Sequence, residues 1–327
     1  MTVNATHTDA MPGTRSQPGL QPEHLTAGTQ PRPSATAAEA VRAYLRLQLQ
    51  ALISLEPLAR RDEPDAVHQM RVATRRLRGT LRTFGEVIPR SETDHAAAEL
   101  KWLGGLLGAA RDDEVLAARL EATVRSVPVE LLLGPVQARV QGHFAPLRAA
   151  ARAELIAALD SPRYASLLAD LDRLAVDPPP GPQAAAPARD VLPAAVARAY
   201  RQVKRRIRRA WQEPAGPPRD AALHQARKSA RRARYAAEAA APVAGKQARR
   251  FAAQMKKVQS VLGEHQDAVL ARQAARELGI GAHLAGENAF SYGLLLEREA
   301  CAAERLQARA RRVWRRASRR RHRRWMS

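Results

Sequence analysis

The residues most able to do chemistry in this chain are arginines and histidines that repeat at helical spacing. Five basic side chains with no acidic residue among them form the first row: His68, Arg71, Arg75, Arg78 and Arg82. On a helix that advances about 100° per residue, these five share one narrow face, and Arg76 lies beside it. Guanidinium groups can make bidentate hydrogen bonds to phosphate oxygens, so the row predicts a binding site for a phosphate-bearing anion.

The opposite face of the same segment is apolar, with Met70, Ala73, Leu77, Leu81 and Phe84 at helical spacing. This pattern predicts an amphipathic helix that buries one face and presents the arginines on the other. Like charges three or four residues apart destabilise a helix by roughly a few tenths of a kcal/mol per pair, so an acid-free row is weakened until an anion neutralises it. A solvated helix face is the alternative, although such faces usually intersperse acidic residues.

A second copy of the pattern occurs in the other half of the chain, with every spacing preserved. Its row consists of His224, Arg227, Arg231 and Arg234, with Lys228 and Arg232 beside it. Further along, Lys101, Leu107-Gly108 and Asp112 recur as Lys256, Leu262-Gly263 and Asp267. Two sets of residues repeated at nearly one offset, about 155 residues, predict an internal duplication. Duplicated units often pack around a pseudo-twofold axis, so we expect both rows to line one basic cleft or pore.

The repeated residues outside the rows are open to more than one role. His68 and His224 begin their helices and either donate to phosphate or bond to the backbone. Asp112 and Asp267 are poor phosphate ligands, so we expect each to orient an arginine or to cap a helix. Lys101 and Lys256 either reach the cleft or face water. Neither histidine has a metal-binding partner three or four residues away, and we expect no metal and no cofactor.

One further basic segment precedes the second copy, and another ends the chain. Residues 198–209 contain no acidic residue, and we expect Lys204 and Arg208 to join the polyanion site. After Glu304 every charged residue is basic. This run predicts a helix end that frays into a basic tail at 315–327, which either attracts polyanions without specificity or is only solvated.

The composition favours a polyanion as the partner. The chain has 54 Lys and Arg against 32 Asp and Glu, a formal net charge of +22, and such a field attracts polyanions. Only 6 of the basic residues are lysines, which suits bidentate phosphate contacts, although GC-rich coding gives the same bias. The single cysteine, Cys301, excludes an intramolecular disulfide and favours a cytoplasmic location. No apolar run is long enough to predict membrane insertion.

The distribution of helix formers and helix breakers predicts an all-α fold. From Ala37 onward the chain is rich in Ala, Leu and Arg, with few β-branched runs. Helix boundaries are expected at Pro64, Pro89, Pro128 and Pro162 in the first half, and at 214–218, Pro242 and 279–281 in the second. The expected parts are a disordered leader (1–36), a first helical repeat (37–176), a linker (177–190), a second helical repeat (191–314) and the basic tail.

These motifs resemble those of the CHAD domain, the conserved histidine α-helical domain. The segments His68–Arg78 and His224–Tyr235 are similar to its signature helix, and the segments ending at Asp112 and Asp267 to its companion motif. The resemblance covers about residues 37–314 and implies two helical bundles around a basic central channel that binds inorganic polyphosphate. CHAD proteins often lie at bacterial polyphosphate or polyhydroxyalkanoate granules. Many carry a CYTH triphosphatase domain, but no segment with its Glu-x-Glu strands precedes these motifs, so we expect a standalone CHAD protein.

The expected function is therefore non-enzymatic binding of inorganic polyphosphate by a cytoplasmic, granule-associated protein. Nonspecific nucleic-acid binding stays open, because the charge supports it equally. Aromatic residues, on which single-strand binders stack bases, make up only 4% of the chain. A polyphosphate-processing accessory enzyme is the other alternative, although the sequence has neither a P-loop nor a cluster of metal-binding carboxylates.

Overall fold

The computed structural model describes residues 35–326, and the fold in this range is built from helices. The long helices are α1 (Ala37–Arg60), α2 (Ala66–Thr83), α3 (Arg90–Arg125), α4 (Val136–Leu159), α5 (Pro162–Val176), α6 (Ala188–Gln212), α7 (Pro217–Leu284) and α8 (Phe290–Ala317). The short 3-10 turns are η2 (Val129–Leu131), η3 (Arg320–His322) and η4 (Arg324–Met326). The described range contains no β-strand, so the all-α prediction is confirmed. The predicted leader lies outside this range, except for Ala35 and Thr36.

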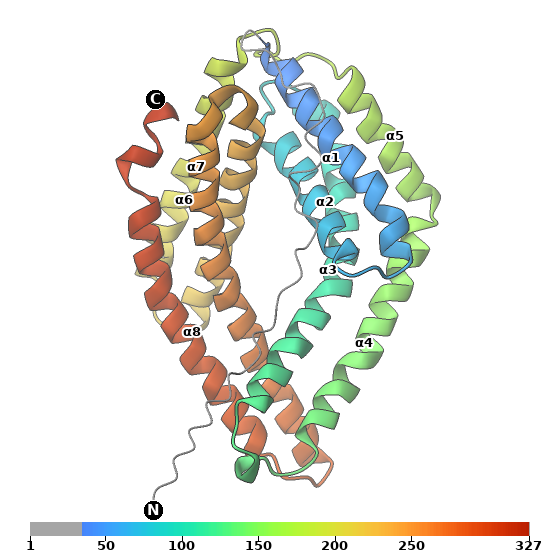
Figure 1. Cartoon of the computed structure of the whole chain (residues 1–327), viewed down its shortest axis with the longest axis vertical. Helices are drawn as coiled ribbons and strands as arrows, with labels where there is room; N and C mark the ends of the chain where they lie inside the picture. Colours follow the sequence, from blue (N-terminus) through green and yellow to red (C-terminus); the bar gives the residue numbers. More distant parts are fainter. Residues whose placement is uncertain (1–34, 327) are drawn as a thin grey trace, which may run out of the picture.

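The helices form two bundles, α1–α5 and α6–α8, which approach each other at both ends and diverge between (Figure 1). At one end a continuous core joins the bundles and includes Leu77 of α2 and Val203 of α6. At the other end α3 and α4 pack on α7 and α8 through a second core, which includes Leu120 and Leu278. Because two separate junctions fix the bundles relative to each other, side chains on α2 and α7 are held in constant positions.

Prolines mark the predicted helix ends of the first bundle. Pro89 immediately precedes α3, and Pro162 is the first residue of α5. Pro64 and Pro128 lie in the connections that follow α1 and α3. Proline lacks the backbone N–H that a helix interior needs, so it is best tolerated at these ends. Pro57, Pro146 and Pro193 nevertheless lie inside α1, α4 and α6.

α7 departs from the predicted boundaries at two points. Pro242 lies inside the helix, and the path breaks instead at Gly245, where φ is 64° and ψ is −140°. Residues 279–281 are helical, and α7 continues to Leu284. Gly279 is needed for packing rather than for a turn, because a Cβ there would lie 3.0 Å from Cβ of Tyr292.

The break at Gly245 gives the two bundles the same helix order. α6, the two parts of α7 and α8 follow one another as α1, α2, α3 and α4 do in the first bundle, which ends with the additional helix α5. This order agrees with the predicted duplication, which itself stays a prediction.

The connection between the bundles is an ordered segment of residues 177–187, slightly shorter than the predicted linker. Its backbone pairs with the α2–α3 connection, since the Gly181 amide donates to the Val87 carbonyl oxygen at 2.9 Å. A Cβ at Gly181 would lie 2.7 Å from the Glu86 carbonyl oxygen, so this approach requires glycine. The connection is thus attached to the first bundle beside the start of α3.

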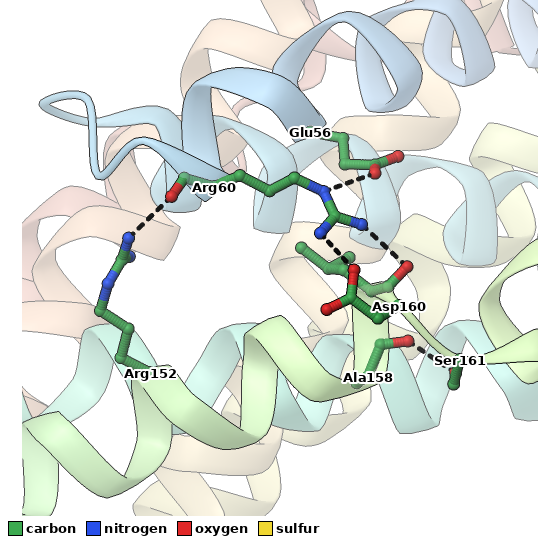
Figure 2. A network of polar contacts seen from close by, with 7 residues as sticks. Glu56, Arg60, Arg152, Ala158, Asp160 and Ser161 are labelled. Atoms are coloured by element: carbon green, nitrogen blue, oxygen red, sulfur yellow. Dashed lines mark hydrogen bonds and ion pairs between the residues drawn. The ribbon is translucent and has the colours of Figure 1, made fainter.

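Several arginines hold helix ends together (Figure 2). Arg60 Nε donates to Glu56 Oε1 at 2.9 Å, and Arg60 Nη1 donates to Asp160 Oδ1 at 2.6 Å. Arg152 of α4 donates from Nη2 to the Arg60 carbonyl oxygen at 3.0 Å. These bonds satisfy carbonyl groups that the end of a helix leaves free and fix α1 against α4 and α5. Arginine enrichment in this chain therefore has a structural component.

The C-terminal segment is folded, which corrects the prediction of a fraying basic tail. α8 continues to Ala317, and residues 320–326 form two short turns. The Trp325 ring lies 6.2 Å from the Phe251 ring, and Trp325 Nε1 donates to the His322 carbonyl oxygen at 3.1 Å. Trp325 and Met326 also pack against the main core. Apolar contacts that sequence spacing did not indicate therefore hold this segment in place.

Candidate anion-binding site

The helices that carry the two rows are amphipathic in the way that their spacing predicts. The predicted apolar residues of α2 are all buried: Met70, Ala73, Leu77, Leu81 and Phe84. The predicted packing face of α7 is buried as well: Ala226, Ala233, Ala237 and Ala240. Burial of these faces sets the rotation of both helices and so determines where the basic rows point.

The two rows meet where α2 packs against α7. A Cβ added to Gly79 would lie 3.3 Å from Cδ2 of Tyr235, so the two helices are in contact at that point. Gly79 and Tyr235 occupy equivalent positions in the two copies of the motif. Arg75 and Arg231, which are also equivalent, are close enough for Arg231 to lower the pKa of Arg75. Equivalent residues that meet in pairs are expected near a pseudo-twofold axis, and this geometry supports the predicted duplication.

In the first bundle a glycine and an aspartate support Arg71. The guanidinium lies over Gly108, with Nη2 3.6 Å from the position of an added Cβ. Arg71 Nη1 and Nη2 donate to the two oxygens of Asp112 at 2.7 and 3.0 Å. Glycine therefore leaves room for the arginine, and Asp112 has the orienting position that the sequence offered as one alternative.

The second bundle repeats this support with one difference. Arg227 lies over Gly263, with Nε 3.4 Å from the position of an added Cβ. Burial raises the pKa of Asp267, while the nearby Arg227 lowers it. Asp267 forms no ion pair with Arg227 within residues 35–326, in contrast to the pair that Arg71 makes with Asp112. Buried Nε atoms without a hydrogen-bond partner occur in both Arg71 and Arg227.

We call Arg71, Arg75, Arg227 and Arg231 the central arginine cluster. Burial, together with repulsion from Arg231 and Arg71, lowers the pKa of Arg75 to about 9. Burial, with a smaller contribution from Arg227, lowers the pKa of Arg231 to about 10. Both guanidinium groups stay charged at neutral pH, and in the described part of the chain neither has a carboxylate partner. An anion between them would remove their repulsion and replace part of the hydration that they lose.

The two predicted histidines lie beside the cluster, half-buried at the start of their helices. Burial lowers the pKa of His68, and Arg111 and Arg71 lower it as well, while Asp65 opposes them. Burial also lowers the pKa of His224, to about 4, with Lys228 contributing. Both imidazoles are therefore neutral at pH 7 in the free protein. A phosphate nearby would favour their protonated forms.

Glu238 makes the two rows unequal. It occupies the position in the second row that corresponds to Arg82 in the first. Arg76 Nε of α2 donates to Glu238 Oε2 at 2.9 Å, and Arg234 Nε donates to Glu238 Oε1 at 2.6 Å. All three side chains are about one-fifth exposed or less. Arg76 and Arg234, both predicted to bind the anion, thus share one carboxylate in a contact that joins the bundles.

A second group of arginines extends the positive surface along α2. Burial lowers the pKa of Arg78, with repulsion from Arg82 and Arg232. Burial likewise lowers the pKa of Arg232, with repulsion from Arg82, Arg206 and Arg90. Lys228 connects this group to the central cluster, since burial lowers its pKa with contributions from Arg231, Arg227 and Arg78. The predicted residues of both rows, apart from Arg76 and Arg234, therefore form one continuous basic strip.

The predicted basic residues outside the rows are exposed, and the part of Lys101 and Lys256 in the site stays a prediction. Lys101 is on α3, and Lys256 borders a depression of about 290 Å³ that also contains Glu238. Lys204 and Arg208 lie on α6 at about 160° from Arg206, the α6 arginine that does reach the strip. The structure therefore brings Arg206 into the site in place of the two residues chosen from the sequence.

Sequence reasoning also overlooked Arg90, Arg111 and Arg119. Arg111 directly precedes Asp112 and lowers the pKa of His68, a proximity that its place in the motif could have indicated. Arg119 donates from Nε to the buried Glu299 at 2.8 Å, a partner in the other bundle that no local pattern predicts. A cleft or pore between the rows stays a prediction.

Within residues 35–326, no group of three or more His, Cys, Asp or Glu side chains is arranged to hold a metal ion. None of the described helices combines the length and the apolar character needed to cross a membrane.

Comparisons with known proteins agree with this architecture. The family model of the CHAD domain matches residues 43–276. Two relatives from Mycobacterium tuberculosis, "Uncharacterized protein MT2285" (strain CDC 1551 / Oshkosh) and "Uncharacterized protein Rv2226" (strain ATCC 25618 / H37Rv), are each 35% identical over 288 residues. The match covers 87% of this chain but 53% of each relative, so the chain spans about half their length.

Two solved structures share the fold. PptA from Streptomyces chartreusis has a TM-score of 0.72 at 23% identity, with 86% of this chain and 100% of that chain covered. The CHAD domain from the plant Ricinus communis has a TM-score of 0.64 at 28% identity, with 88% of this chain and 94% of that chain covered. No CYTH domain is evident within residues 35–326, which are helical throughout their ordered elements. The family model and the shared fold place this chain in the CHAD family.

Proposed function

We propose that this chain binds inorganic polyphosphate without catalysis, through the central arginine cluster and the basic strip that continues from it. The observation that carries the proposal is the pairing of Arg75 with Arg231, two half-buried guanidinium groups from different bundles. Burial lowers the pKa of both, Arg231 lowers that of Arg75 further, and neither has a described carboxylate partner. A fold that keeps such charges together bears a cost, and a linear phosphate polymer would offset that cost along the whole strip.

The shape of the ligand follows from the arrangement of the strip. Its residues come from α2, α3, α6 and α7, and those at the centre are half-buried. A polymer with phosphate at every unit and no sugar or base can bring an oxygen to each guanidinium in turn. Nucleic acid carries bulky groups between its phosphates, and the strip has no exposed aromatic side chain to stack on a base.

Filter binding across a range of salt concentrations tests this proposal directly. We expect a long-chain polyphosphate to bind more tightly than DNA or RNA of equal charge, with an affinity that falls steeply as salt rises. Changing both Arg75→Glu and Arg231→Glu should reduce polyphosphate affinity at least about 100-fold, because two charge-assisted contacts become repulsive.

The matched control is the pair Arg125→Glu and Arg173→Glu. It changes the net charge equally at exposed positions of the first bundle, whose ion pairs are long, at 3.8 Å each. If both variants lose affinity to the same degree, net charge alone attracts the polymer and the central cluster is not the site. Circular dichroism should show unchanged helicity in both.

We propose further that the protein acts in the cytoplasm at polyphosphate or polyhydroxyalkanoate granules, and that it processes nothing there. A fluorescent fusion should concentrate on granules in cells that store polyphosphate, and the central double variant should remain dispersed. Incubation with Mg²⁺ and polyphosphate should release no more phosphate than a denatured sample. Release above that level would identify an enzyme and overturn this part of the proposal.

A further inference from the structure

A second basic surface lies on the C-terminal half of α8, beyond the part of the chain that the CHAD family model matches. Four arginines at helical spacing form it: Arg312, Arg315, Arg316 and Arg319. The buried face of α8 includes Ala303, Ala310 and Ala317. At about 100° per residue, Arg312, Arg315 and Arg316 point to the opposite side of the helix, and Arg319 follows just beyond the helix end. We call them the outer arginine face.

The arginines of the outer arginine face surround a common depression and are not isolated surface charges. Its four side chains alone line a depression of about 270 Å³. All four residues are exposed, and none has an ion pair within residues 35–326. No acidic residue follows Glu304 in the sequence, so no carboxylate from the same segment competes for these guanidinium groups. Four donors around one depression suit a phosphate group.

Aromatic contacts hold this surface against α6. Trp314 stacks on Tyr200 with ring centroids 6.0 Å apart, and the Arg323 guanidinium lies 5.6 Å from the same Tyr200 ring. Arg311 lies 4.4 Å from the centre of the Trp211 ring. Because these rings are engaged within the fold, they position the arginines but are not free to stack on unpaired bases.

Basic residues of two other helices adjoin the outer arginine face. Burial lowers the pKa of His322, and Arg319 lowers it together with Lys257 and Arg250 of α7, which places α7 beside the face. On α6, Lys204 and Arg208 lie on the same flank as Trp211, the ring that Arg311 covers. The α6 residues that do not reach the central strip therefore extend a surface on the outside of the second bundle.

We propose that the outer arginine face binds the phosphate backbone of double-stranded nucleic acid, independently of base sequence and separately from the central cluster. The breadth of the surface favours a duplex, since α6, α7 and α8 each contribute cations and a duplex presents two rows of phosphates. A single polyphosphate strand would cover only part of this surface. Single-stranded nucleic acid is disfavoured because no aromatic platform is free. With both sites occupied, the protein joins a polyphosphate chain to a duplex.

Fluorescence anisotropy with a labelled random-sequence duplex of about 30 base pairs tests the proposal on the full chain. The outer variant changes Arg312, Arg315, Arg316 and Arg319 to Glu. We expect the outer variant to bind the duplex at least about tenfold more weakly than the wild type. The slope of the logarithm of its association constant against the logarithm of salt concentration should be shallower by about 3 to 4, because each lost phosphate contact contributes about 0.9 to that slope. The control changes Arg61, Arg125, Arg148 and Arg173 to Glu, which alters net charge equally on the first bundle. It should keep the wild-type slope.

Three further results decide whether the two surfaces are separate. The outer variant should bind polyphosphate as the wild type does, and the central variant Arg75→Glu with Arg231→Glu should bind the duplex as the wild type does. Protein saturated with one equivalent of polyphosphate should still bind the duplex. The proposal is overturned if the control variant loses duplex binding equally, if the central variant abolishes it, or if one equivalent of polyphosphate expels the duplex. The duplex-binding measurements on the outer, central and control variants use no polyphosphate. They therefore test the outer arginine face even if the protein does not bind polyphosphate.

Discussion

Replacing Arg75 and Arg231 with methionine should stabilise the free protein and weaken its binding of polyphosphate. Methionine keeps much of the length and apolar stem of arginine but removes the charge. Burial, with repulsion from neighbouring arginines, lowers the pKa of Arg75 to about 9 and that of Arg231 to about 10, both well below the ordinary value of a guanidinium. Since each pKa unit corresponds to about 1.4 kcal/mol, the charged forms are disfavoured by roughly 5 and 3 kcal/mol.

The net gain in stability is smaller than these two figures together. Removing Arg231 already relieves part of the repulsion on Arg75, water reaches side chains that are only half-buried, and methionine forgoes some polar contacts. We therefore expect the double variant to gain about 2 kcal/mol in free energy of unfolding. For a chain of this size that corresponds to an increase of about 3 °C in Tm. The gain should shrink at high salt, which screens the repulsion in the wild type.

Thermal melting followed by circular dichroism, with and without polyphosphate, measures both effects in one experiment. Polyphosphate should raise the Tm of the wild type and should raise that of the double variant much less, because a ligand stabilises the state that binds it. The exposed pair Arg125→Met and Arg173→Met is the control and should change neither quantity appreciably. A double variant that melts lower than the wild type and still binds polyphosphate normally would refute the view that these arginines are held together for an anion.

Three further outcomes follow from the site. The pKa of His224 is about 4 in the folded protein and about 6.5 when unfolded, so the free energy of unfolding of the free protein should fall as pH drops from 6.5 towards 4. The loss, measured by urea titration, should reach up to roughly 3 kcal/mol. Polyphosphate affinity should rise over the same pH range, because the bound anion favours the protonated imidazole. Asp112→Asn keeps one of the two acceptors that orient Arg71 and removes a negative charge, so it should leave polyphosphate affinity within about twofold of the wild type. Asp112→Leu keeps neither acceptor and should lower the affinity about tenfold. Equal effects of the two in filter binding would exclude an orienting role. Glu238→Gln should lower the free energy of unfolding, measured in urea, by about 2 kcal/mol, because it leaves Arg76 without its carboxylate at the contact between bundles. Unchanged stability would show that this ion pair contributes nothing.

Sequence periodicity was sufficient for the features that depend on one helix alone. The apolar stripe from Met70 to Phe84 specified the buried face of α2, and the residues opposite it specified the basic row. The Gly108 position was recognisable as part of a repeated motif, but its purpose was not. Gly108 leaves room for the guanidinium of Arg71, which belongs to α2. The spacing of residues within α3 gives no indication of this contact.

Features that depend on contacts between helices were beyond the sequence. Glu238 neutralises Arg76 across the bundle contact, although only its spacing from Arg234 is visible locally. Lys204 and Arg208 were assigned to the site from charge alone, whereas the rotation of α6 decides which of its cations reach α7. The fold of the C-terminal segment likewise depends on Trp325 meeting Phe251, two residues far apart in the chain.

The two basic surfaces differ in what they require of the fold. Arg75 and Arg231 lose hydration when the bundles come together, so the protein bears their repulsion whenever no anion is bound. Arg312 and Arg316 stay hydrated, and their exposure makes them nearly neutral for folding. On the proposed function, each ligand should raise the Tm according to its own affinity and concentration, whichever surface it occupies. The central variant should lose the stabilisation by polyphosphate only, and the outer variant should lose the stabilisation by the duplex only. This result in a thermal titration would assign each polymer to its own surface. Because the centre is preorganised by two bundle junctions and the outer face by aromatic packing, neither binding event needs a rearrangement of the other surface, and occupancy of the two should be independent.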